Sequence, residues 1–167
     1  MGLDKVKFAK GYEVYALIRS LNFEIEADIR HQLEEHDITF PGFRILWILS
    51  FHSIMTMTDL AYLAQANISN VFRQLDKLKE GGLVKIVSGI DARKKEVHLT
   101  KKGRLIVQTF IDKHSASSDL RIVELVEKIP KEDLNTFIEV ASYMNKALVG
   151  EPYYEFVKKS TTDIARS

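Results

Sequence analysis

The chain has 167 residues, of which 46% are hydrophobic and 28% are charged, which is the ordinary range of globular proteins. This length suits one domain, or one small domain with an appendage. The longest apolar run, residues 45–49, is far shorter than the roughly 20 residues of a membrane span. The first residues show no signal peptide, and there is no cysteine to form disulfides or thiolate zinc sites. We therefore expect a cytoplasmic protein with no membrane partner.

Positive charge is concentrated in one segment of a chain whose net charge is only +1. Residues 73–104 contain ten Lys or Arg and four Asp or Glu, a net charge of +6. The flanking residues 1–40 and 105–167 carry −3 and −2, and residues 41–72 are neutral. This asymmetry predicts a local surface for a polyanion.

The N-terminal part of the chain has the pattern of a long helix. Apolar residues recur at helical spacing over residues 6–36, with charges between them and no proline. A helix of about 25 to 30 residues spans roughly 40 Å, which is more than a domain of this size can cover. We therefore expect part of its apolar stripe to pack on a second chain. A second helix is predicted after the cap Thr39, with Pro41 in its first turn and a nearly fully buried stretch over residues 43–51.

Two short helices joined by a tight turn follow. Thr56 and Asp59 form a capping-box pattern at the start of the first helix. After a break in the pattern, Asn67 or Ser69 offers a cap for the second helix, which ends at the glycine pair 81–82. This arrangement is typical of a helix-turn-helix.

Beyond the glycines, the pattern changes from helical to alternating. Residues 83–87 and 96–100 alternate apolar and polar side chains around a turn, which predicts a two-stranded hairpin. Its inner face is expected to consist of Val84, Ile86, Val97 and Leu99. Because an isolated hairpin is marginally stable in water, it must pack on the preceding helices. The sequence thus predicts a mainly α fold with a small two-stranded β wing, a winged helix-turn-helix.

The second helix of the helix-turn-helix carries side chains suited to reading DNA. Off its apolar stripe lie Ser69, Asn70, Arg73 and Gln74, with Lys77 one turn further. Side chains at this position reach base edges in the major groove, where Arg pairs with guanine and Asn or Gln with adenine. Lys77 is better placed for a phosphate. Alternatively, these are merely solvated residues of an amphipathic helix, but the basic segment and the hairpin favour DNA binding.

The hairpin and the helix after it resemble MarR-family transcriptional regulators. Residues 91–103 fit the family pattern Asp-x-Arg, five residues, Leu-Thr-x-x-Gly, with matches at Asp91, Arg93, Leu99, Thr100 and Gly103. Residues 58–84 are similar to the family's helix-turn-helix, and the resemblance covers roughly residues 10–115. Residues 44–51 and 68–78 also resemble a Bacillus branch that regulates protease production and sporulation.

This resemblance implies a homodimeric, sequence-specific transcriptional regulator, either a repressor or an activator, that binds double-stranded DNA at a pseudo-palindromic site. It assigns Arg93 to the minor groove and Asp91 to holding the wing, and a narrow A·T-rich minor groove does attract an inserted Arg. Lys94 and Lys95 are then expected to meet phosphates.

The same resemblance divides the chain into regions. Residues 1–36 and 104–150 would form a helical dimerisation region whose N- and C-terminal helices intertwine with those of a second copy. Residues 37–103 would form the DNA-binding winged helix-turn-helix. We expect residues 151–167 to be a partly disordered extension.

A small-molecule effector is a further expectation from the resemblance. Many family members bind an anionic or phenolic ligand between the dimer helices and the winged helix. In this sequence Tyr12, Tyr15, Phe43 and Trp47 are candidates to line such a cleft, although the same residues suit a hydrophobic core.

Other classes of function are disfavoured. The chain has no phosphate-binding glycine-rich loop, nucleophile elbow or HExxH motif, so we do not expect an enzyme. Its five histidines lack the spacing of metal ligands, and neither a metal nor another cofactor is predicted. The alternative function is a winged-helix protein-interaction module that does not bind DNA. Such a module has no need for three exposed cations in its wing.

Overall fold

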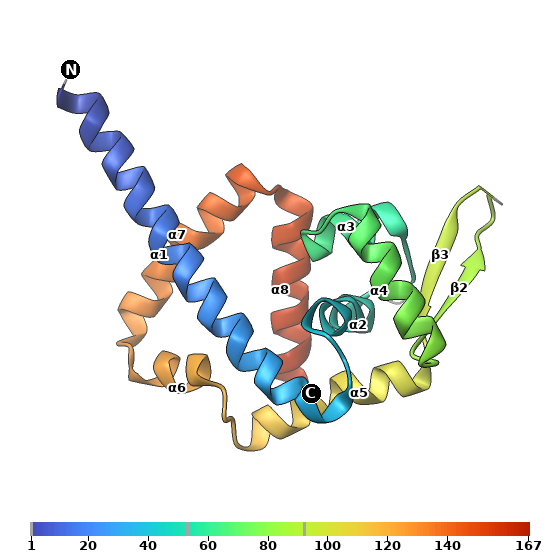
Figure 1. The fold of residues 1–167 in the computed structure, drawn as a ribbon. Coiled ribbons are helices and arrows are strands. Elements are labelled where there is room, and N and C mark those ends of the chain that lie inside the picture. Colours follow the sequence, from blue (N-terminus) through green and yellow to red (C-terminus); the bar gives the residue numbers. More distant parts are fainter. Residues whose placement is uncertain (1, 53, 92) are drawn as a thin grey trace.

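The computed structural model describes residues 2–52, 54–91 and 93–167. It is mainly helical with a small antiparallel sheet, as the sequence predicted (Figure 1). Among the described residues, no helix has the length and apolar character needed to cross a membrane. The elements in chain order are α1 (Gly2–Leu33), the short 3-10 helix η1 (Glu34–His36), α2 (Phe40–Phe51), β1 (Ile54–Thr56), α3 (Met57–Ala64), α4 (Ile68–Glu80), β2 (Val84–Ser88), β3 (Lys95–Leu99), α5 (Lys101–Ala116), α6 (Arg121–Lys128), α7 (Lys131–Leu148) and α8 (Glu151–Arg166).

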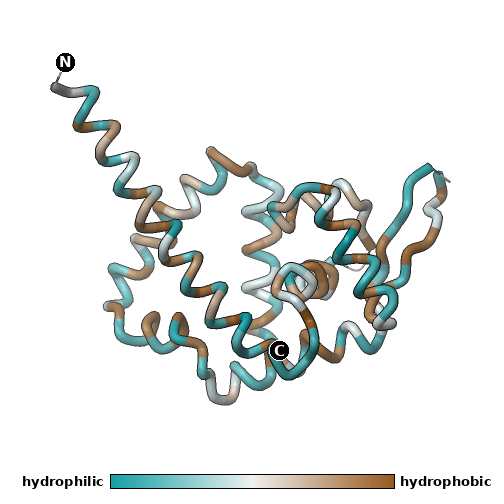
Figure 2. Tube along the Cα trace, in the orientation of Figure 1, coloured by the Kyte–Doolittle hydropathy of each residue, from teal (hydrophilic) through white to brown (hydrophobic). Residues whose placement is uncertain are grey.

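Helix α2 is the centre of the hydrophobic core. It packs against α3, α4, α5 and α8, which surround it in Figure 1. Ile45, Leu46, Ile48 and Leu49 are all buried, and Trp47 packs at the edge of the same cluster. Figure 2 shows this helix as strongly hydrophobic, whereas hydrophobic and hydrophilic residues alternate along α1. The apolar run in the sequence therefore marks the helix on which the others pack.

Side-chain caps start the helices where the sequence predicted them. The Oγ1 atoms of Thr39, Thr56 and Thr100 each accept the backbone N–H three residues further on, at 3.1 to 3.2 Å. The sequence left two candidates for the cap of α4. The structure selects Asn67, whose Oδ1 accepts the N–H of Asn70 at 2.8 Å.

The wing contains the predicted hairpin and one additional strand. Strand β2 pairs antiparallel with β3, with Val84 opposite Leu99 and Ile86 opposite Val97. Strand β1 pairs with the other edge of β3, so the sheet has three strands in the order β1-β3-β2 rather than the two that we expected. A strand of three residues is too short to show an alternating pattern, and only its pairing partner identifies it.

The end of α4 is closed by backbone hydrogen bonds that reverse the chain. The N–H of Leu83 donates to the Leu78 carbonyl at 2.8 Å, and the N–H of Gly82 donates to the Lys79 carbonyl at 2.9 Å. This is a Schellman ending, in which Gly82 has the left-handed φ of +70° that a residue without Cβ adopts freely. The second glycine of the pair therefore sets the direction in which the wing leaves α4.

The start of α5 is bonded to this same corner. The Leu83 carbonyl accepts two hydrogen bonds from Thr100, one from its backbone N–H at 3.1 Å and one from its Oγ1 hydroxyl at 3.0 Å. Gly103 lies directly against Leu83, and a Cβ there would overlap the Leu83 carbonyl oxygen and lie 2.7 Å from a methyl carbon of Leu99. Thr100 and Gly103 of the family pattern thus hold the two ends of the wing together.

The expectation of a partly disordered extension at residues 151–167 is wrong, because helix α8 occupies all but its last residue. Phe156 and Ser160 are buried. The Nζ of Lys159 donates to the Phe51 carbonyl at the end of α2, at 2.9 Å. The sequence shows a short amphipathic segment after a proline, and the groove of α2 and α3 that it covers exists only in the folded chain.

Helices α1 and α7 leave many apolar side chains in solvent. Figure 1 shows the N-terminal half of α1 extending away from the other helices. Although α7 packs on α8, much of its own surface is uncovered. The large exposed apolar residues of these two helices are Val6, Phe8, Tyr12, Val14, Tyr15, Leu17, Ile18, Leu21, Phe23, Phe137, Ile138, Val140, Tyr143 and Leu148.

The Gly103 contact predicts a stability effect. Gly103→Ala should lower the free energy of unfolding by about 1 to 3 kcal/mol, because the added methyl group meets backbone that cannot move aside. Lys101→Ala, which places alanine at an exposed position of the same helical turn, should change it by less than about 0.5 kcal/mol. Urea unfolding followed by circular dichroism measures both. Equal stability of the two variants would contradict the close contact.

Candidate nucleic-acid interface

Helix α4 turns an apolar face to the core and a polar face to solvent. Val71, Leu75 and Leu78 are buried, as their spacing predicted. The exposed face carries Ser69, Phe72, Arg73, Asp76 and Lys77. Asp76 was not among the predicted contact residues, and its position one turn after Arg73 is the sequence signal that identifies it as part of this face.

Asn70 and Arg73 form a pair on this helix. The Nη2 of Arg73 donates to the Oδ1 of Asn70 at 2.9 Å. An Asn that reads adenine uses this same oxygen to accept from the base, so the bond to Arg73 competes with that role. The bond also restricts the guanidinium to a defined direction. Asn70 therefore orients Arg73 and has less capacity to accept another hydrogen bond.

Gln74 does not belong to the exposed face, so the prediction that it reads bases is wrong. Only 8% of Gln74 is exposed. Its Oε1 accepts a hydrogen bond from the Oγ1 of Thr39 at 2.7 Å, while Thr39 in turn caps α2 through the N–H of Gly42. A polar residue beside the apolar stripe looks like a surface residue in sequence. Here the start of α2 covers it.

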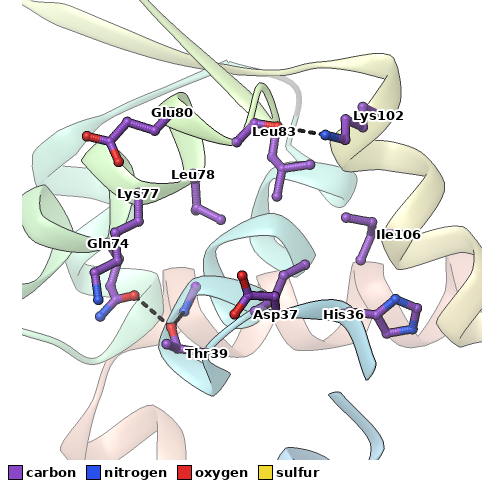
Figure 3. Close-up of a pocket in the computed structure, with 13 residues that line it drawn as sticks. His36, Asp37, Thr39, Gln74, Lys77, Leu78, Glu80, Leu83, Lys102 and Ile106 are labelled. Carbon is purple, nitrogen blue, oxygen red and sulfur yellow. Dashed lines mark hydrogen bonds between the residues drawn. The ribbon is translucent and has the colours of Figure 1, made fainter. Parts of the chain in front are cut away.

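A cavity of about 500 Å³ lies beside this hydrogen bond (Figure 3). Its walls come from the segment before α2, the C-terminal half of α4 and the start of α5. Figure 3 shows Lys102 reaching across, where its Nζ donates to the Gly81 carbonyl at 2.9 Å. Lys77 also lines the cavity, so its side chain borders both this hollow and the exposed face of α4.

The turn of the wing is held by Asp91 through backbone bonds. The Oδ1 of Asp91 accepts the N–H of Arg93 at 3.1 Å, and its carbonyl accepts the N–H of Lys94 at 2.8 Å. The N–H of Gly89 donates to the Lys94 carbonyl at 2.8 Å and closes the turn. Asp91 therefore fixes the backbone that carries Arg93 and leaves the guanidinium itself exposed.

The wing cations lie beside Phe72 of helix α4. A hollow of about 520 Å³ is lined by Phe72 of α4, by residues 56–59 at the start of α3, and by Arg93, Lys94 and Lys95. Within the described residues, no salt bridge joins a carboxylate to these three wing cations or to the Arg73 and Lys77 side chains. The positive charge of this surface is therefore available to a ligand.

Two of the four predicted cleft residues meet in a separate aromatic cavity. Phe43 and Trp47 line a hollow of about 450 Å³ between α1, α2, α5 and α8, with Phe110 4.8 Å from Phe43 between ring centroids. Tyr12 and Tyr15 do not line it and lie exposed on the N-terminal half of α1. Helical spacing alone cannot distinguish an exposed apolar stripe from a pocket wall. The sequence pattern therefore predicted one cleft for all four aromatic residues.

Two histidines are packed against the aromatic rings of this region. Burial lowers the pKa of His114, whose ring lies 4.4 Å from that of Phe110, and the charge of Lys113 lowers it further. Burial also lowers the pKa of His52, and the charge of Lys159 adds to this effect. Both rings are therefore held neutral more strongly than a free imidazole. Among the described residues, no three side chains of His, Asp or Glu form a group able to hold a metal ion.

Comparisons with known proteins place this geometry in a known fold. No family model matches the sequence. The chain is 27% identical over 113 residues to an uncharacterized HTH-type transcriptional regulator of Bacillus subtilis (strain 168), YfiV, covering 67% of this chain and 68% of that protein.

Solved structures of transcriptional regulators superimpose on this chain. A MarR-family transcriptional regulator from Silicibacter pomeroyi superimposes with a TM-score of 0.67 at 24% identity, covering 83% of this chain and 91% of that one. The MepR–DNA complex of S. aureus gives a TM-score of 0.68 at 23% identity, covering 80% and 96%. The chain has the MarR-type winged-helix fold. In this fold α3 and α4 form the helix-turn-helix, and β2 and β3 form the wing.

The buried position of Gln74 predicts that its loss affects stability. Gln74→Ala should lower the free energy of unfolding by about 1 to 3 kcal/mol, because the Thr39 hydroxyl loses its acceptor in a partly buried site. The exposed Lys77→Ala should change it by less than about 0.5 kcal/mol. Chemical denaturation measures the difference. A Gln74→Ala protein as stable as the wild type would contradict the buried, hydrogen-bonded position of Gln74.

Proposed function

We propose that this protein is a transcriptional regulator that binds double-stranded DNA. The observation that carries the proposal is a set of cations that, within the described residues, form no salt bridge. Arg93, Lys94 and Lys95 line one hollow with Phe72 of α4, and Arg73 and Lys77 stand on the exposed face of that helix. A surface that keeps several cations free of carboxylates is suited to phosphates, which supply much of the affinity of protein–DNA complexes. MepR, which has the same fold, is known in complex with DNA.

In the proposed complex, α4 enters the major groove and the wing lies over the adjacent minor groove. Arg73, oriented by Asn70, contacts guanine through its two terminal nitrogens. Arg93 enters the minor groove from the turn that Asp91 holds. Lys77, Lys94 and Lys95 contact phosphates, and Ser69 at the exposed start of α4 lies closest to the groove floor.

The proposed regulator is a homodimer. The apolar side chains that α1 and α7 leave exposed are too numerous for a monomer, and a second copy covers such a surface by symmetry. Residues 1–36 and 104–150 then form the dimerisation region, and residues 37–103 bind DNA. With α8 packed on α2, residues 151–167 belong to the winged-helix core. Two recognition helices related by a two-fold axis read half-sites roughly 10 base pairs apart, and such a dimer on a promoter represses transcription.

An effector is part of the proposal. The aromatic cavity at Phe43 and Trp47 has the size of a small-molecule site, and Arg44 at its edge donates to the Tyr153 hydroxyl at 3.5 Å. The Nη1 of Arg44 also lies 4.0 Å from a carboxylate oxygen of Glu26, which lines the same cavity. A small aromatic anion would therefore compete with Glu26 for the guanidinium. Because the cavity joins α1 to α2, such a ligand would bias the position of the winged helix relative to the dimer helices.

The DNA-binding proposal predicts different effects for two neighbouring cations. Arg93→Ala should weaken binding most on sites with an A·T-rich segment under the wing, because a narrow minor groove attracts an inserted guanidinium. Lys94→Ala should weaken binding to all sequences alike. Because the proposed dimer places two wings on the DNA, each variant should reduce the salt dependence by about two released ions. Mobility-shift titrations at several salt concentrations measure both effects. If the wild type shifts no DNA in a salt-sensitive way, the function is that of a protein-interaction module.

The dimer is tested by a charge in the exposed stripe of α1. Ile18→Glu should increase the dimer dissociation constant at least about tenfold, because it buries an unpaired carboxylate in the interface. Ser20→Glu adds the same charge at a polar exposed position two residues away and should leave the dimer intact. Sedimentation equilibrium of both variants gives the comparison, and equal dissociation constants would contradict an interface at Ile18.

A further inference from the structure

The tip of the wing carries an apolar side chain in full contact with solvent. Ile90 has a relative exposure of 109%, the highest of the large hydrophobic residues described. It differs in setting from the exposed residues of α1 and α7, which form long stripes on helices. Here a single isoleucine projects from a turn whose other exposed side chains include three cations.

Hydrogen bonds between described residues hold both sides of the turn that carries Ile90. The turn is closed by the hydrogen bond between Gly89 N–H and the Lys94 carbonyl, at 2.8 Å, and by those that Asp91 accepts. Gly89 has little space for a side chain, because a Cβ would lie 2.9 Å from a carboxylate oxygen of Glu96 and 3.1 Å from the Lys94 carbonyl. The chain is therefore packed tightly up to the residue before Ile90, and Ile90 is the first side chain that extends beyond it.

We propose that Ile90 enters the DNA minor groove beside Arg93 and packs on the deoxyribose walls at a base step. This inference rests on the proposed DNA-binding function and adds a contact that carries no charge. The minor groove combines apolar sugar walls with phosphates at its edges, which matches an isoleucine followed by Arg93, Lys94 and Lys95. Apolar side chains inserted in this groove open base steps and bend the duplex.

The position of the wing favours DNA over a membrane surface as the occupant. The wing cations line one hollow with Phe72 of α4, so the wing reaches the same ligand as the recognition helix. A ligand that extends along both elements must be long and negatively charged. A duplex meets both requirements.

The contact has a consequence for sequence preference. The exocyclic amino group of guanine stands in the minor groove and would meet the isoleucine, whereas A·T pairs leave the groove floor free. Inosine paired with cytosine lacks this amino group but keeps the major-groove pattern of guanine. Replacing G·C by I·C under the wing should therefore strengthen binding by the wild type, and this gain should be smaller for Ile90→Ser.

The experiment compares full-length wild type, Ile90→Ser and Val87→Ser on one high-affinity duplex selected with the wild type. Val87 is an exposed apolar residue of β2 away from the tip and serves as the matched control. Ile90→Ser should weaken binding about tenfold for each wing in the groove, because the serine side chain loses the apolar contact with the sugar walls. Its salt dependence should match the wild type, because no cation is lost. The bend of the duplex, measured by energy transfer between its labelled ends, should decrease.

The outcomes separate this inference from the proposed function. If the wild type binds DNA with strong salt dependence and Ile90→Ser has the same affinity and bend, the inference is overturned and the function stands. If Val87→Ser weakens binding as much as Ile90→Ser, the tip has no special role and the inference is also overturned. If the wild type binds no duplex, both fail. If Ile90→Ser loses binding only to phosphatidylglycerol vesicles, the tip belongs to a membrane contact and the inference fails.

Discussion

The corner where α4, the wing and α5 meet is the contact on which the DNA-facing surface depends. The carbonyls at the end of α4 accept hydrogen bonds from the start of α5, through Thr100 and through Lys102. The wing is the chain between these two points, so its base cannot shift without breaking bonds at both ends. Gly103 permits the approach because it has no side chain to separate α5 from Leu83. One short-range contact thereby sets where the recognition helix and the wing cations stand relative to each other.

The single chain buries the apolar residues of its core but leaves those of its outer helices exposed to solvent. Around α2 the apolar residues are buried, and even the C-terminal helix α8 contributes Phe156 to that cluster. Along α1 and α7, large apolar residues face solvent instead. This division separates a winged-helix unit with a buried core from two helices whose apolar side chains the proposed second copy would cover. The aromatic cavity lies at the junction of the two, which is where a bound ligand would have most effect on their relative position.

The structure gives different contacts to the polar residues of α4 that the sequence could not distinguish. Ser69, Asn70, Arg73, Gln74 and Lys77 look equivalent in sequence, because all lie off the apolar stripe. In the structure Gln74 supports the start of α2, and Asn70 is engaged by Arg73. Arg73 then has a defined direction, and Lys77 borders a cavity. Asp91 likewise acts on the backbone amide of Arg93 rather than on its side chain.

The sequence by itself determined the elements whose signals are local. Caps, the glycine ending of α4, the inner face of the hairpin and the concentration of cations all depend on residues a few positions apart, so spacing was enough to predict them. Only the tertiary structure decided the third strand, the docking of α8, the burial of Gln74 and the separation of Tyr12 and Tyr15 from Phe43 and Trp47. Each of these depends on a partner that is distant in sequence. A side chain is buried, paired or exposed according to that partner, and no local pattern carries this information.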